Sequence, residues 1–271
     1  MLHYGHSNFD AANDSIFASF RELTPPDSPS PDRTDITIDV HWEDTRNGDS
    51  RSEVGIEWHI TEDISPVRSM WMQRADATGR LTRSPNGKIQ ADWTAHIDHP
   101  AQLHSAVKMT LAYALSFDGN FLLHASGVLR RGKLWLFAGP SGSGKSTIAE
   151  QLNAGGSLFC TDQAVLSVSE GIVEAYATPL SDFDARSRIR DRYPVEALIF
   201  IRQSQTHSLR RLFEHELGVR LLRNILFIPG ADDRTRILLD SVSRIASSVP
   251  GYALEFKKDC EFWPLLDQCR I

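Results

Sequence analysis

The sequence predicts an α/β protein in which a small antiparallel β region precedes a larger α/β core. Three observations predict this. Apolar and polar residues alternate over 36–42 and again over 54–60, with the period of half-buried strands. Apolar residues recur at helical spacing over 100–115. Between 134 and 152 an apolar run, a glycine-rich segment and a helical pattern follow one another directly.

These patterns divide the chain into three regions. Residues 1–33 are expected to be a flexible arm, because the prolines between 25 and 31 cannot continue a helix or a central strand. The arm's segment 15–20 is compatible with a short docked helix and also with disorder. Residues 34–120 hold the β region and one helix, and 121–271 are expected to form the core.

The elements follow from the same periodicities. In the β region the strands end with a hairpin whose turn is signalled by Pro85-Asn86-Gly87. Pro100 opens the helix of this region, and Gly119 stops it. The sequence predicts further strands at 70–75, 89–93, 121–124, 133–138, 158–160, 165–168, 172–177, 197–201 and 252–256, and helices at 145–153, 214–224 and 233–247.

Composition limits the class of protein. The chain has 271 residues, of which 41% are hydrophobic, enough for one large core or two small ones. A net charge of −6 argues against a nucleic-acid partner. No apolar run reaches the ~20 residues of a membrane helix, and the amino terminus lacks a signal-peptide pattern. Three cysteines without zinc spacing fit reduced thiols. We therefore expect a cytoplasmic protein with no membrane partner.

The glycine-rich segment carries the most specific motif. The pattern Gly-x4-Gly-Lys-Ser fits Gly139, Gly144, Lys145 and Ser146, between a predicted strand and a predicted helix. Glycines let backbone N–H groups approach phosphate oxygens, and a helix amino terminus adds positive potential. The sequence thus predicts a nucleoside triphosphate site whose binding residues are Gly139, Ser141, Gly142, Ser143, Gly144, Lys145, Ser146 and Thr147.

Two members of this segment have distinct roles. Lys145 supplies a positive charge to the β- and γ-phosphates, and the Ser146 hydroxyl is a ligand for Mg²⁺. ATP and Mg²⁺ are therefore the expected cofactors. The alternative is a glycine-rich turn without a ligand, which the agreement of strand, full motif and helix disfavours.

Two residues outside the loop are candidates for the same site. Asp162 follows a short apolar strand after the loop's helix, where it could hold Mg²⁺ or act as a base. Spacing alone leaves it equally a turn residue. His124 ends an apolar strand before the loop, and a lone histidine there is more often a core residue.

The segment Leu123-His124-Ala125-Ser126-Gly127-Val128, the glycine-rich loop and Thr161-Asp162 together resemble the HPr kinase/phosphorylase family. The likeness is greatest to the smaller HPr-kinase-like kinases found beside clusters for ribosomally made peptides, including lasso-peptide kinases. It covers 121–182 well and the flanking regions more loosely. It implies a core related to the HPr kinase C-terminal domain and to phosphoenolpyruvate carboxykinase.

The resemblance also implies roles. Asp162 would be the catalytic base toward a serine hydroxyl and a metal ligand, and His124 would lie beside the γ-phosphate. One departure concerns the family's second acidic residue, which is Gln163 here; an amide cannot neutralise Mg²⁺ as a carboxylate does.

The sequence therefore predicts an ATP-dependent kinase that phosphorylates a serine, on a peptide or small protein, with Asp162, His124 and Lys145 as catalytic residues. Two alternatives remain open: a kinase of a free small molecule such as serine, and a nucleotide-binding regulator without transfer activity. The acceptor is not identified, and both a monomer and a homo-oligomer are compatible with the sequence.

Overall fold

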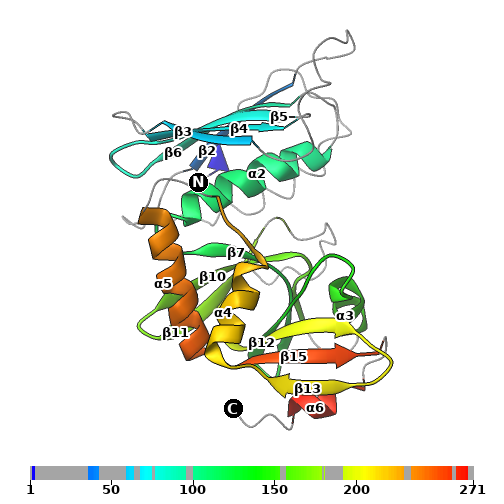
Figure 1. Cartoon of the computed structure of the whole chain (residues 1–271). Coiled ribbons are helices and arrows are strands. Elements are labelled where there is room, and N and C mark those ends of the chain that lie inside the picture. Colours follow the sequence, from blue (N-terminus) through cyan, green and yellow to red (C-terminus); the bar gives the residue numbers. More distant parts are fainter. Residues whose placement is uncertain are drawn as a thin grey trace. The chain divides into compact units, whose positions relative to one another are not determined.

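The computed structural model describes residues 2–3, 36–42, 59–63, 68–74, 77–95, 100–152, 157–178, 180, 192–228, 233–257 and 261–267 (Figure 1). The chain separates into two compact units near residue 115. The first comprises Met1–Ala114 with Ile228–Asp233, and the second comprises Leu115–Phe227 with Arg234–Ile271.

Among its described residues, the first unit contains a six-stranded sheet and one helix. Its strands are ordered β1 (Leu2–His3), β2 (Ile36–Trp42), β6 (Ile89–Ala95), β5 (Ala77–Arg83), β4 (Arg68–Arg74) and β3 (His59–Asp63). Helix α2 (Pro100–Leu115) belongs to the same unit. The indole Nε1 of buried Trp93 donates a hydrogen bond of 3.0 Å to Oγ1 of Thr110, which joins β6 to α2.

The expectation of an antiparallel β region is wrong in one respect. Strands β3 to β6 pair antiparallel, but β2 pairs parallel with both β1 and β6. Alternation along a strand reports which side chains are buried and carries no information on the partner or its direction. The predicted hairpin is confirmed, with Gly87 at φ 84° in its turn.

Some predictions for this unit lie outside the described residues. These are segment 15–20, residues 54–58 of the second predicted strand, and most of the expected arm 1–33. Within that arm, Leu2 and His3 pair with Ile36 and Thr37 of β2. The role of the arm stays a prediction.

The second unit contains the sheet that builds the candidate site. Its described strands run in the order β11 (Ile172–Ala177), β10 (Gln163–Ser169), β7 (Phe121–Arg130), β8 (Lys133–Ala138), β12 (Arg192–Gln203), β15 (Gly251–Phe256) and β13 (Ser208–Arg211). Two further strands, β9 (Ser157–Cys160) and β14 (Ile225–Leu226), pair with β7. Because β11 also pairs with β12, strand pairing closes into a ring of β7, β8, β12, β11 and β10.

Three central strands of this unit are parallel. β12 pairs parallel with β8 on one side and with β15 on the other, so their carboxyl ends meet at one sheet edge. The run Leu134–Ala138 of β8 is buried at every position, as expected for a strand covered on both faces. The glycine-rich segment follows β8 at this edge.

Helices cover the sheet of the second unit. α4 (Glu214–Leu222) and α5 (Asp233–Ser248) bury Leu217, Leu221, Leu238 and Val242 in the larger apolar cluster. A second cluster contains Ile148 of α3 (Lys145–Leu152) and Leu266 of α6 (Trp263–Asp267). All three predicted helices of this region are confirmed, whereas β13, β14 and α6 were not predicted. Among the helices that the structure describes, none is both long and apolar enough to cross a membrane.

Candidate active site

The segment 139–144 forms a tight loop between β8 and α3, and its glycines are needed for its conformation. Gly142 and Gly144 have φ of 77° and 103°, in the region that only glycine adopts readily. A Cβ added to Gly144 would lie 2.6 Å from Cζ of Phe256, at the end of β15. The loop therefore packs directly against the aromatic ring of Phe256, and a side chain at Gly144 would force this ring or the loop to move.

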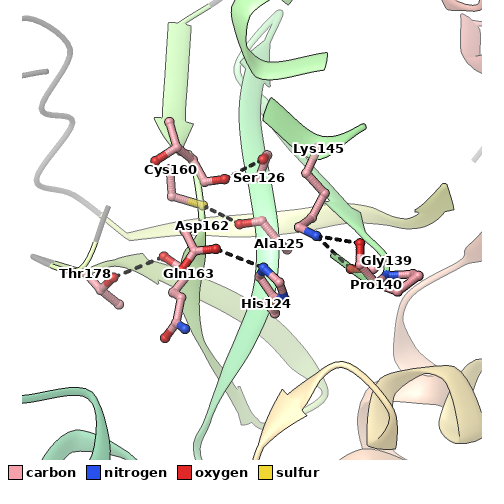
Figure 2. Close-up of polar contacts among 11 residues, drawn as sticks. His124, Ala125, Ser126, Gly139, Pro140, Lys145, Cys160, Asp162, Gln163 and Thr178 are labelled. Carbon is pink, nitrogen blue, oxygen red and sulfur yellow. Dashed lines mark hydrogen bonds and ion pairs between the residues drawn. The ribbon is translucent and has the colours of Figure 1, made fainter. Parts of the chain in front are cut away.

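Lys145 is the first residue of α3 and is nearly buried. Its Nζ donates hydrogen bonds to the carbonyl oxygens of Gly139 at 2.8 Å and Pro140 at 3.0 Å (Figure 2). Burial lowers the pKa of Lys145, and the negative charge of Asp162 partly opposes this shift. An ammonium group is thus held at the base of the loop, with a carboxylate close enough to affect its charge.

The loop's serines occupy different environments. The Ser143 main-chain N–H bonds to the Pro140 carbonyl at 3.1 Å, while its buried Oγ has no hydrogen-bond partner among the described residues. Ser141 and Ser146 are exposed. The Ser146 hydroxyl is therefore accessible to an added ligand.

His124 and Asp162 meet across two paired strands. His124 lies on β7, and Asp162 lies in the short turn between β9 and β10. The main-chain N–H of Ala125 donates to the Asp162 carbonyl at 3.0 Å, and Ser126 Oγ donates to the Thr161 carbonyl at 2.6 Å. These bonds fix the turn against β7. They bring Nε2 of His124 to 2.8 Å from Oδ1 of Asp162, with both side chains about one-third exposed (Figure 2).

A cavity of about 320 Å³ is lined both by the glycine-rich loop and by the pair of His124 and Asp162. It brings together most of the residues that the sequence singled out, but not Gly139 or Ser143. Gly139 instead supplies a carbonyl oxygen to Lys145. The cavity is lined by His124, Ser141, Gly142, Gly144, Lys145, Ser146, Thr147, Thr161, Asp162 and Gln203.

Two of the lining residues, Thr161 and Gln203, were not predicted from the sequence as site residues. Thr161 is adjacent to Asp162, so its position follows from that of the aspartate. Gln203 is the last residue of β12, and its Nε2 donates to the Gly142 carbonyl at 3.2 Å. Only the strand order places it beside the loop, and no local motif in the sequence signals this position.

Gln163 stands apart from the cavity. Its side chain is 2% exposed, and its main-chain oxygen accepts a bond of 3.1 Å from Oγ1 of Thr178. Directly opposite it on β7 is His124. The residue that replaces the expected second acid is thus buried in the sheet, and it does not line the cavity.

The donors facing the cavity fit a triphosphate with Mg²⁺. Lys145 provides positive charge, and the Ser146 hydroxyl and Asp162 carboxylate are the hard oxygen ligands that Mg²⁺ prefers. Among the described residues no three or more His, Cys, Asp or Glu side chains cluster as a metal site. Mg²⁺ bound with phosphates needs only one or two protein ligands, so this arrangement suits it.

No protein-family model matches the sequence, and no curated protein matches it either. Among solved structures, the Hpr(Ser) kinase/phosphatase from Coxiella burnetii aligns with 54% of this chain and 90% of its own, at 13% identity and a TM-score of 0.31. Similarity this distant carries no conclusion about activity.

Proposed function

We propose that the chain is an ATP-dependent kinase that transfers the γ-phosphate to a hydroxyl, with a serine of a peptide or small protein as acceptor. The observation that supports this best is the shared cavity. A glycine-rich loop with a buried lysine and a carboxylate held by a histidine face the same space. The first pair suits phosphate binding, and the second suits removal of a proton from an acceptor.

Each residue of the cavity then has a role. The loop's main-chain N–H groups and Lys145 bind the phosphates, and Ser146 with Asp162 would hold Mg²⁺. When bound, Mg²⁺ would neutralise part of the negative charge on the phosphates. Asp162 takes the proton of the acceptor hydroxyl while the oxygen of that hydroxyl bonds to the γ-phosphorus. The bond from phosphorus to the β–γ bridging oxygen breaks, and ADP leaves.

Most of the rate enhancement would come from positioning and electrostatic stabilisation. His124 contributes as a positioning residue, because its Nε2 holds one oxygen of Asp162. The Asp162 side chain is partly exposed, which leaves the carboxylate accessible to a hydroxyl from solvent. That accessibility favours an acceptor presented from outside the fold.

The test uses radiolabelled ATP with Mg²⁺ and two sets of acceptors: a degenerate serine-containing peptide library with its alanine-substituted counterpart, and free serine. We expect label on the serine peptides only, and transfer slower by ~10²–10⁴ with the Asp162→Asn variant. Label on free serine would support a small-molecule kinase. ATP binding without label on any acceptor would support a nucleotide-binding regulator.

A further inference from the structure

Gln203 lies at the point where two parallel strands and the glycine-rich loop converge. It ends β12, pairs in register with Phe256 of β15, and lines the cavity with Lys145 and Asp162. Its Nε2 is 3.2 Å from the Gly142 oxygen and 3.2 Å from the position that a Cβ of Gly144 would occupy. The amide therefore touches the loop at its two left-handed glycines.

The chemistry of this amide suits a second role. A carboxamide nitrogen carries two hydrogens, and the bond to the Gly142 carbonyl uses one. The side chain is exposed and lines the cavity, so its other hydrogen is available to a bound ligand. An anionic oxygen in that cavity would gain a hydrogen bond from a group that is already held in place by the loop.

We propose that Gln203 binds a phosphate oxygen of the nucleotide while it anchors the loop at Gly142. This inference rests on the proposed function and adds a binding residue contributed by β12. Through Gln203, phosphate binding is coupled to the position of the glycine-rich loop. Removing the amide should weaken nucleotide binding without affecting the fold, because the side chain is exposed.

The experiment compares three variants of the full chain. Gln203→Met keeps the length of the side chain and removes both donors, and Gln203→Glu keeps the shape and adds a negative charge. Gln205→Met is the control, since Gln205 is exposed and does not line the cavity. Calorimetry measures ATP and ADP affinity with Mg²⁺ at two salt concentrations, ³¹P NMR follows the bound nucleotide, and thermal melting confirms folding.

We expect Gln203→Met to weaken ATP binding roughly tenfold or more, as for a lost hydrogen bond to a charged group. Gln203→Glu should weaken it further, and high salt should reduce this excess because repulsion between charges is screened. The ³¹P signals of bound ATP should shift in Gln203→Met and not in the control.

Other outcomes separate this inference from the function on which it rests. If the wild type binds ATP and both Gln203 variants bind it within twofold of that affinity, the inference is wrong and the nucleotide site of the proposed function is unaffected. Equal losses in the two variants, with unchanged ³¹P signals, would limit Gln203 to supporting the loop and overturn the phosphate contact. Absence of ATP binding by the wild type would overturn both proposals.

Discussion

Nε2 of His124 lies 2.8 Å from Oδ1 of Asp162, a contact between a strand and a turn that are well separated in the chain. The main-chain bond from Ala125 to Asp162 fixes the two segments in register. An imidazole in this position restricts the rotation of the carboxylate. The pair therefore presents the carboxylate to the cavity in one orientation, which is what a general base requires.

Replacing Asp162 by Asn tests whether this carboxylate is a base. The amide keeps the size of the side chain but cannot accept a proton, so single-turnover transfer should fall by ~10²–10⁴. ATP affinity should stay within a few fold because Lys145 and the loop still hold the phosphates. A strong shift in the magnesium dependence would instead make Asp162 chiefly a metal ligand. Unchanged transfer and magnesium dependence would leave it a turn residue.

Replacing His124 by Ala tests the positioning role. We expect a loss of transfer smaller than the ~10²–10⁴ of Asp162→Asn, because the base itself remains. The loss should appear in kcat, with KM for ATP nearly unchanged. His215→Ala is the matched control, since His215 is exposed on α4 and does not line the cavity. Equal rates for His124→Ala and the control would show that the contact with Asp162 has no role in transfer.

Much of this site was predictable because its parts are local. The strand, glycine-rich loop and helix around Lys145 are consecutive in the sequence, and each has its own pattern. The contact between His124 and Asp162 depends on the register of β7 with β10, which single-sequence periodicity does not give. The position of Gln203 beside the loop depends on the order of the strands, and so does the parallel pairing of β2. These features are set by tertiary packing between distant segments.

Replacing Lys145 by Ala should weaken ATP binding strongly and abolish turnover. Its Nζ lies at the base of the loop. ADP and ATP should both lose affinity because, in the proposed site, this charge would serve more than one phosphate. Titration calorimetry with Mg²⁺ measures this, and Lys133→Ala serves as the control because Lys133 pairs with Glu196 away from the cavity. An unchanged ATP affinity would show that the loop is not part of the ATP-binding site.

Acid should weaken the start of α4 through Glu216. Hydrogen bonds from the Arg210 guanidinium and the Phe213 main-chain N–H lower the pKa of Glu216 from 4.5 to about 2. A carboxyl whose folded pKa is depressed stabilises the fold above its unfolded pKa, and this contribution is lost as the pH falls toward the folded value. Glu216→Gln should therefore melt below the wild type at pH 6, and the difference should disappear between about pH 5 and pH 2. A difference that does not change with pH would contradict the assignment.

Gln163 gives the last prediction, because an acidic residue was expected at its position. Among the described residues, its buried Oε1 has no hydrogen-bond partner. Gln163→Leu should leave stability unchanged or raise it, since an unsatisfied buried oxygen costs about 1–3 kcal/mol.

Gln163→Glu should lower the free energy of unfolding by several kcal/mol at pH 8, because burial disfavours the charged form. Burial also raises the pKa of that new carboxyl, so the loss should shrink toward pH 5 as it becomes protonated. Urea unfolding at both pH values measures this. A Gln163→Glu protein that is as stable as the wild type and binds Mg²⁺ more tightly would show that position 163 can serve the metal after all.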